Sequence, residues 1–267
     1  MKKTIQYSIS FIILILISVF IYTFFFFNPD NFKDEIGEYI SSKIQYKFTY
    51  DSTTWSYDPS PSVSMKGIKI IDDIAMPNKK IIDIDEAVIA ISKENLMNQV
   101  IDAEEVVANN LIYYGVNVDE ILMKTYSLIK FKNFSSLSKN NATKIYQLYS
   151  TAKIEEQNMQ INDIKIESEL LQARGKGTIN LSTKEVLFNL KGTLRDLQSI
   201  RQVKYKENYP QELQGKILPI RIQGKMDNLK VSIDLEDIIV EEIINPLKDK
   251  LIEKIQDDIK EKIKLPF

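Results

Sequence analysis

An uncharged apolar run at the start of the chain constrains how everything after it can fold. No charged residue occurs from Thr4 to Pro29, and Ile9–Phe27 consists mostly of Ile, Leu, Val and Phe. A helix rises about 1.5 Å per residue, so about 20 such residues cross the hydrocarbon core of a bilayer. The run therefore predicts a single membrane-spanning anchor. The side chains expected to contact lipid in this anchor are Ile9, Phe11, Ile13, Leu14, Leu16, Val19, Phe20, Phe24 and Phe27.

The charges that flank this run predict its orientation. Lys2 and Lys3 precede it, whereas the acidic residues Asp30, Asp34 and Glu35 follow it. Lysine and arginine are enriched on the cytoplasmic side of membrane helices. We therefore expect a cytoplasmic N-terminus, with all residues after 29 on the far side of the membrane.

Two alternatives to an uncleaved anchor are a cleaved signal peptide and a buried core helix. Cleavage requires small residues after the apolar core. Here the core ends in Phe24–Phe27, and the first alanine of the chain is Ala75. The chain has no cysteine, which excludes a lipoprotein signal. The length and flanks of the run favour the anchor.

Composition excludes several classes of function. Without Lys2 and Lys3, 33 of the 35 basic residues remain against 37 acidic ones, a net charge of −4, and no basic run is present. The chain therefore lacks the electrostatic footprint of a nucleic-acid-binding protein. It has no cysteine, no histidine and only 8 glycines. Histidine is the commonest general base and metal ligand, cysteine supplies thiol chemistry, and glycines form phosphate-binding loops, so we expect no enzyme, no cofactor and no metal site.

After a short helix at about 30–44, the apolar residues recur with a period of two, which is typical of half-buried strands. Phe48 and Tyr50 alternate with Lys47 and Thr49, for example. We predict about ten antiparallel strands in a mostly β (α+β) fold with short helices. The predicted strands cover 46–57, 63–71, 81–92, 100–109, 111–118, 159–166, 171–181, 186–194, 218–222 and 229–233, with the last turn at Asp227–Asn228.

The remaining segments predict helices and connections. We expect a short crossing at 93–98, a helix from Glu120 to Phe131, and one or two helical turns over Ala142–Tyr149. At the end of the chain, Leu251, Ile255 and Ile259 belong to an apolar row with a four-residue spacing. This spacing predicts an amphipathic helix, which can pack on the sheet, cap its end or lie on a membrane surface. Packing on the protein is the interpretation we favour.

These elements divide the chain into five expected regions. They are a cytoplasmic N-terminus with the anchor (1–29), an N-terminal β-rich module (30–132), a linker or helical connection (133–155), a C-terminal β-rich module (156–235) and the amphipathic helix (236–267).

Several sequence segments together resemble the AsmA family of Gram-negative envelope proteins. The first is the anchor followed by NPDNFKDEI (28–36), and the second is the Pro-Ser turn and strand YDPSPSVSMKGI (57–68). The third is IDEAVIAI (84–91) with VIDAEEV (100–106). The fourth combines ARGKGTINL (173–181) with LPIRIQGKMDNLKV (218–231) and DLE (234–236). The resemblance covers most of the chain except about 119–155, and the family is usually much longer.

The resemblance implies a β-rich body in the periplasm, anchored in the bacterial inner membrane and linked to outer-membrane assembly. It also implies a relation to bridge-like lipid transfer proteins, whose curled sheet has an apolar inner face. Phospholipid and the membrane are then the expected partners, with other envelope proteins possible and no nucleic acid. The residues expected to line this groove are Phe48, Tyr50, Val63, Met65, Ile179, Leu181, Phe188, Leu190, Ile220, Ile222, Val231 and Ile233.

The same alternation fits an ordinary closed core, because every half-buried sheet alternates. The alternative to a lipid-binding protein is therefore a non-catalytic structural or regulatory envelope protein that binds a protein partner. Gly175–Thr178 superficially suggests a phosphate loop, but the upstream glycine and the Gly-Lys-Ser/Thr order are missing, so we interpret it as strand. We interpret the acidic pairs near 72 and 83 as surface charge, and the acidic group at 234–242 as a helix start.

Overall fold

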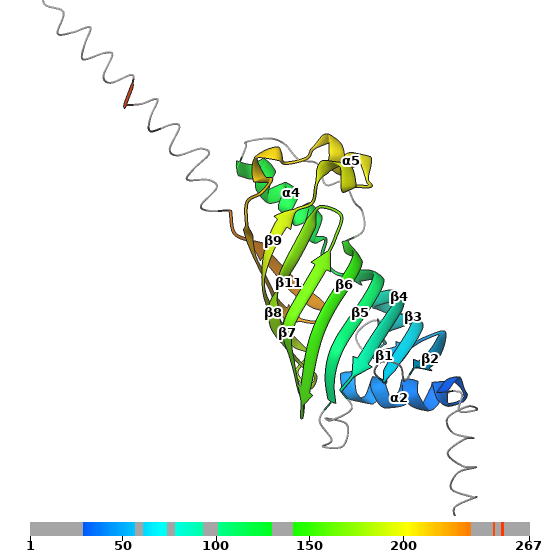
Figure 1. Ribbon diagram of the computed structural model, residues 1–267. Helices are drawn as coiled ribbons and strands as arrows, with labels where there is room; N and C mark the ends of the chain where they lie inside the picture. The colour runs from blue at the N-terminus through cyan, green and yellow to red at the C-terminus, as the bar shows by residue number, and fades with distance from the viewer. Residues whose placement is uncertain are drawn as a thin grey trace, which may run out of the picture.

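A computed structural model describes residues 29–56, 61–73, 78–92, 101–129 and 141–235, together with the single residues 248, 252 and 253. These residues form one antiparallel sheet of 11 strands, in the order β1-β3-β4-β5-β6-β7-β8-β9-β10-β11, with β2 pairing to β3 (Figure 1). The mostly β fold is thereby confirmed. The expected anchor (1–29, except Pro29) and almost all of the expected C-terminal helix lie outside the described residues. No helix within the described ranges is long and apolar enough to cross a membrane.

The strands follow one another along the chain as a meander. They are β1 (Lys47–Thr49), β2 (Ser52–Ser56), β3 (Ser62–Asp72), β4 (Lys79–Ile91), β5 (Ile101–Tyr114), β6 (Ala142–Glu155), β7 (Asn158–Glu167), β8 (Leu171–Asn180), β9 (Glu185–Leu194), β10 (Leu218–Lys225) and β11 (Asn228–Ile233). The helical elements are η1 (Pro29–Phe32), α2 (Lys33–Ile44), α4 (Val118–Ile129), η2 (Leu197–Ser199), α5 (Val203–Glu207) and η3 (Gln211–Leu213). The expected helices at 30–44 and 120–131 are present as α2 and α4.

The two strands expected at 100–109 and 111–118 are one strand, β5. The interruption falls at Asn110, which has a left-handed φ of 51°. Asparagine tolerates this region of backbone space better than most residues do. Pairing continues on both sides of it, because Asn109 pairs with Glu86 of β4 and Leu111 pairs with Ile84. The change of phase in the sequence therefore marks an irregularity within a strand and not a turn.

The helical turns expected at 142–149 are also wrong, since this segment is the first half of β6. Ile145 and Leu148 both line the inner face of the sheet although they are three residues apart. An irregularity between them produces a helix-like spacing of apolar residues in a strand. Because β6 pairs with both β5 and β7, one sheet runs through both expected β-rich modules and through 142–155, which was expected to be part of a connection.

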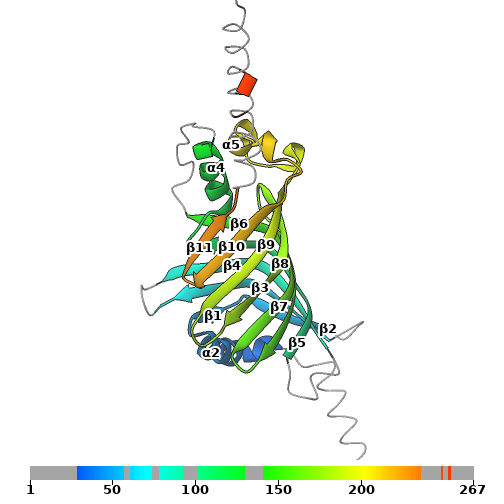
Figure 2. The same ribbon diagram turned by 90° about the vertical axis from the view of Figure 1, so that its left-hand side faces the viewer.

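The sheet is strongly curved, with an apolar inner face and a polar outer face. In β10, for example, Leu218 and Ile220 are buried, whereas Pro219 and Arg221 are exposed. Figure 2 shows β10 and β11 lying opposite β3 and β4. Met226, in the turn before β11, packs in the same cluster as residues of β4 and β5. The sheet therefore forms a trough whose apolar face is directed inward.

Two helices cover parts of this inner face, one at each end. Ile36 and Ile40 of α2 pack against a buried cluster that contains Phe48, Tyr50 and Ile68. At the other end, α4 contributes the fully buried Leu122 and Met123, among other residues, to the largest cluster. In Figures 1 and 2, α2 and α4 lie at opposite ends of the sheet.

Two glycines of β8 allow neighbouring side chains to pack closely on the inner face. A Cβ added to Gly177 would lie 2.2 Å from Cδ1 of Phe188, and one added to Gly175 would lie 2.9 Å from Cδ2 of Leu190. Both distances are far too short for carbon atoms in contact. The Gly-Lys-Gly sequence is therefore strand, as predicted, and its glycines make room for two large residues of β9.

Candidate functional site: an apolar groove

The trough encloses an apolar cavity of about 420 Å³ between β4 and β11. Every strand from β4 to β11 contributes to its lining, and none of the lining side chains is charged. Thr143, Ser150 and Tyr113 are the hydroxyl-bearing residues in this lining. Ligand pockets in proteins typically have volumes of about 300–1,000 Å³ and are mostly apolar. The cavity has the size and chemistry of a binding site for an apolar ligand.

The residues expected to line a groove lie in three environments. Ile179, Phe188, Ile222 and Val231 line the cavity. The other residues are either buried beside the cavity or half-buried at its margins. Leu190, Ile220 and Ile233 are buried in the cluster to which α4 contributes. Phe48 and Tyr50 are buried in the cluster against which α2 packs, and Met65 packs against that cluster too. Val63 and Leu181 are half-buried.

Most of the cavity lining comes from strands that sequence reasoning did not single out. β5, β6 and β7 supply a large share of it, including Val106, Leu148 and Ile161. Their alternation could have identified them, but β6 was expected to be helical. Val63 pairs with Ile89 across β3 and β4, and Ile89 lines the cavity, so the apolar inner face continues from the cavity toward β3.

A tyrosine joins the two sides of the trough. The Tyr113 hydroxyl on β5 donates a hydrogen bond to the carbonyl oxygen of Met226 at 3.0 Å and accepts one from the N–H of Leu229 at 3.4 Å. β5 and β11 are not neighbours in the sheet. These bonds therefore join β5 to the β10–β11 turn across the cavity, and we call this contact the Tyr113 seam. Burial raises the pKa of Tyr113, so the hydroxyl keeps its proton.

A second contact lies beside the seam. Lys184, in the turn between β8 and β9, donates a hydrogen bond to the carbonyl oxygen of Gln45 at 3.1 Å. Its ammonium group also lies 4.0 Å from the centre of the Tyr46 ring. The carbonyl oxygen of Lys184 accepts the N–H of Met226 at 2.9 Å. The two hairpin turns and the end of α2 are thus joined at one end of the trough.

The other end is fixed by a buried carboxylate at the start of α4. Asp119 accepts hydrogen bonds from the hydroxyl of Ser168 at 2.7 Å and from the N–H of Leu170 at 2.9 Å. Burial raises the pKa of Asp119, and the hydrogen bonds that it accepts oppose this rise. The interaction ties α4 to the turn between β7 and β8.

Glu169 ties the same turn to the segment before α5. It accepts hydrogen bonds from the backbone N–H groups of Arg201 at 2.5 Å and Gln202 at 2.7 Å, and from the Tyr146 hydroxyl. Burial alone would raise the pKa of Glu169, but these hydrogen bonds outweigh burial and lower it. Burial and the neighbouring Glu169 raise the pKa of Tyr146 to about 12. Through these bonds Glu169 stabilises the connection between the β7–β8 turn and the segment before α5.

Within the ranges that the structure describes, no group of His, Cys, Asp or Glu is placed to hold a metal ion. The apolar groove, by which we mean the cavity together with the inner face around it, has the chemistry of a binding site. No curated protein matches the chain. The model of the AsmA family matches residues 1–111, which extend from the expected anchor into β5. The resemblance to the AsmA family predicted from the sequence is therefore confirmed over this part of the chain.

Proposed function

We propose that this is a non-catalytic, inner-membrane-anchored periplasmic protein that holds phospholipid acyl chains in its apolar groove and thereby supports outer-membrane biogenesis. The family match supports a role in the cell envelope. The observation that carries the proposal is the cavity of about 420 Å³ without a charged side chain in its lining. An acyl chain is an unbranched apolar ligand, and such a lining suits it.

Energetics favour an occupied groove. The side chains that line an empty groove lose packing contacts that a ligand would supply. Filling the cavity with water is also unfavourable, because the lining offers few hydrogen-bonding groups. Each methylene of an acyl chain that leaves water for the groove would instead contribute about 0.8 kcal/mol.

The shape of the site suggests how a lipid would lie in it. A phospholipid has apolar chains and a charged headgroup, and the lining offers no charged partner for the headgroup. Burying an unpaired charge is costly, so the headgroup would stay outside the groove. Since the Tyr113 seam consists of side-chain hydrogen bonds and not of strand pairing, it is the part of the wall that can open with the least disruption of the sheet.

A structural protein with a closed core is the second candidate. α2 and α4 cover much of the inner face, and the Tyr113 seam joins its two sides. Under this alternative the cavity is a packing defect, and the protein acts by binding another envelope protein. The two candidates differ in what a charge in the cavity wall would do.

The substitution Ile222→Asp tests the proposal, with Gln223→Asp as its control. Ile222 is half-buried in the cavity wall, and its exposed neighbour Gln223 is on the outer face of β10. If lipid enters the groove, the aspartate can meet water or headgroups. We then expect folded Ile222→Asp protein with several-fold less bound phospholipid and raised outer-membrane permeability in cells, while Gln223→Asp behaves as wild type.

Other outcomes of this experiment would contradict the proposal. In a closed core, Ile222→Asp buries an unpaired charge, costs several kcal/mol and abolishes folded protein. That result would favour the structural alternative. Folded Ile222→Asp protein with unchanged lipid content would show that lipid does not bind at the groove.

A further inference from the structure

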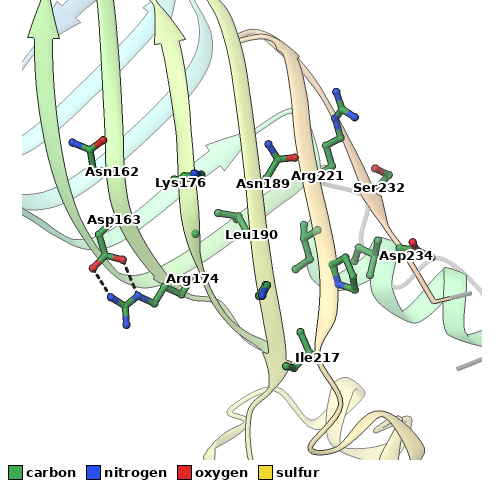
Figure 3. A pocket seen from close by; sticks show the side chains of 15 residues that line it. Asn162, Asp163, Arg174, Lys176, Asn189, Leu190, Ile217, Arg221, Ser232 and Asp234 are labelled. Carbon is green, nitrogen blue, oxygen red and sulfur yellow. Dashed lines mark hydrogen bonds and ion pairs between the residues drawn. The ribbon is translucent and has the colours of Figure 1, made fainter. Parts of the chain in front are cut away.

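The outer face of the sheet carries a second concave region, on the side opposite the groove. This hollow has a volume of about 1,000 Å³ and extends across β7–β11 (Figure 3). Its lining includes the four basic residues Arg174, Lys176, Lys191 and Arg221. The chain as a whole has a net charge of −2, so these four basic residues are not simply a sample of a basic protein. We call this region the outer hollow.

One of the four cations is already paired. Both carboxylate oxygens of Asp163 bind the guanidinium of Arg174, at 2.8 and 3.0 Å, as Figure 3 shows. Lys176, Lys191 and Arg221 have no ion pair or hydrogen bond from their side chains to any part of the chain that the structure describes. The outer hollow therefore presents three cations whose charge is not compensated by direct contact.

The register of the sheet brings these three cations together. Lys176, Asn189, Arg221 and Ser232 lie in one row across β8, β9, β10 and β11. Lys191 lies two residues along β9 from Asn189, on the same face. Neighbouring strands are about 4.8 Å apart, so the Cα atoms of Lys176 and Arg221 are about 10 Å apart, and each is about 8 Å from that of Lys191. Side chains of this length can reach a common anion from these positions.

Part of the remaining lining suits an oxygen-rich anion. Asn162, Asn189 and Ser232 provide neutral hydrogen-bonding groups next to the cations. One edge of the hollow also carries the carboxylate of Asp234, two residues beyond Ser232, together with apolar residues such as Ile217. Arginine binds phosphate oxygens in pairs, and lysine binds them as a point charge.

We propose that the outer hollow binds a phosphate-bearing anion through Lys176, Lys191 and Arg221. The phosphate can belong to a lipid headgroup or to a soluble compound, since both offer the same chemistry to these side chains. The site is on the face opposite the groove and does not depend on a lipid in the groove. β8 contributes to both faces, with Gly175 and Gly177 directed inward and Arg174 and Lys176 outward.

The test compares two triple variants of the full-length protein in nanodiscs of phosphatidylcholine. One variant carries Lys176→Gln, Lys191→Gln and Arg221→Gln in the outer hollow. The control carries Lys204→Gln, Lys206→Gln and Lys225→Gln, which remove the same charge from positions that do not line the hollow. Calorimetry with inorganic pyrophosphate measures binding of a soluble phosphate compound. Co-flotation with phosphatidylcholine vesicles, with or without phosphatidylglycerol, measures binding of a lipid headgroup.

We expect the wild type and the control to bind pyrophosphate, and the outer-hollow variant to bind it at least tenfold more weakly. If the wild type is recruited to phosphatidylglycerol vesicles and the outer-hollow variant is not, the source of the phosphate is a lipid headgroup. Pyrophosphate binding without such recruitment would identify a soluble ligand. The single change Arg221→Gln repeats the comparison if the triple variant does not fold.

Two results would overturn the inference. In the first, the wild type binds no pyrophosphate and does not prefer phosphatidylglycerol vesicles. In the second, the control variant loses as much binding as the outer-hollow variant, which would indicate a response to net charge only. Neither result would bear on acyl-chain binding in the groove.

Discussion

Replacing Tyr113 with phenylalanine removes the hydroxyl that joins β5 to the β10–β11 turn and keeps the ring that lines the cavity. Two hydrogen bonds are lost, one to the carbonyl oxygen of Met226 at 3.0 Å and a longer one from the N–H of Leu229 at 3.4 Å. A typical hydrogen bond contributes about 1 kcal/mol to stability. Because one of the two is long, the seam should lose about 1–2 kcal/mol. A change of this size alters a two-state equilibrium by a factor of roughly 5–30.

We therefore expect the seam to open about 5–30 times more often in Tyr113→Phe, with little change in the amount of ligand bound at saturation. The assay is transfer of a pyrene-labelled phosphatidylcholine from the full-length protein in nanodiscs to acceptor vesicles. Amide hydrogen exchange at Met226, whose N–H binds the carbonyl oxygen of Lys184 and keeps this partner in the variant, reports opening at the seam. Both rates should rise by a similar factor.

Tyr114→Phe is the matched control. The Tyr114 hydroxyl donates a 2.9 Å hydrogen bond to Asp83 on the neighbouring strand β4, and Tyr114 does not line the cavity. Its loss should lower stability by a similar small amount without changing lipid transfer. Equal transfer rates in the two variants, or unchanged exchange at Met226 in Tyr113→Phe, would refute the role given to the seam.

Three further predictions concern the fold, and a fourth concerns the expected anchor. Gly177→Ala places a Cβ 2.2 Å from the Phe188 ring and should lower the free energy of unfolding by about 1–3 kcal/mol in denaturant titrations. By contrast, Gly37→Ala in α2, whose Cβ would lie 3.4 Å from the carbonyl oxygen of Phe48 in β1, should raise that free energy by up to about 1 kcal/mol. The lowered pKa of Glu169 means that its stabilising contribution is complete above the unfolded pKa of about 4.3 and is lost as the pH falls through the folded value. Glu169→Gln should therefore reduce the melting temperature at pH 7 more than at pH 3. The raised pKa of Asp119 gives the opposite pH dependence, so its contribution to stability is lost as the pH rises through the folded value. Finally, a reporter that is active only outside the inner membrane should be active when fused to the C-terminus, and release of a product about 25–30 residues shorter would contradict the anchor.

Local patterns were sufficient to predict much of the sheet. The alternation of Leu218, Ile220 and Ile222 predicted β10, and Asp227–Asn228 placed the turn before β11 within a residue of its observed position. The apolar spacing after Val118 predicted α4. In each case the side chains that decide the structure are close together in the sequence, so their period can be read directly.

Features that depend on distant residues could not be predicted in this way. Ile145 and Leu148 have a helix-like spacing, but pairing makes them strand: both pair with β5, and Leu148 also pairs with β7. The Tyr113 seam joins this tyrosine to Met226 and Leu229, which lie 113 and 116 positions further along the chain. Nothing in the sequence around Tyr113 marks it for this role. The hydrogen bonds of Asp119 to the turn at 168–170 have the same character. The curvature of the sheet, and hence the groove, is a property of the whole sheet.

Photo-crosslinking in living cells tests the central claim most directly. A photoreactive amino acid is placed at Ile222 in the cavity wall or at the adjacent Gln223 on the outer face, and the full-length protein is examined for covalently attached phospholipid. Our account predicts a phospholipid adduct at position 222 that is absent or at least several-fold weaker at position 223. Equal labelling at the two positions, or no phospholipid adduct at position 222, would contradict acyl-chain binding in the groove.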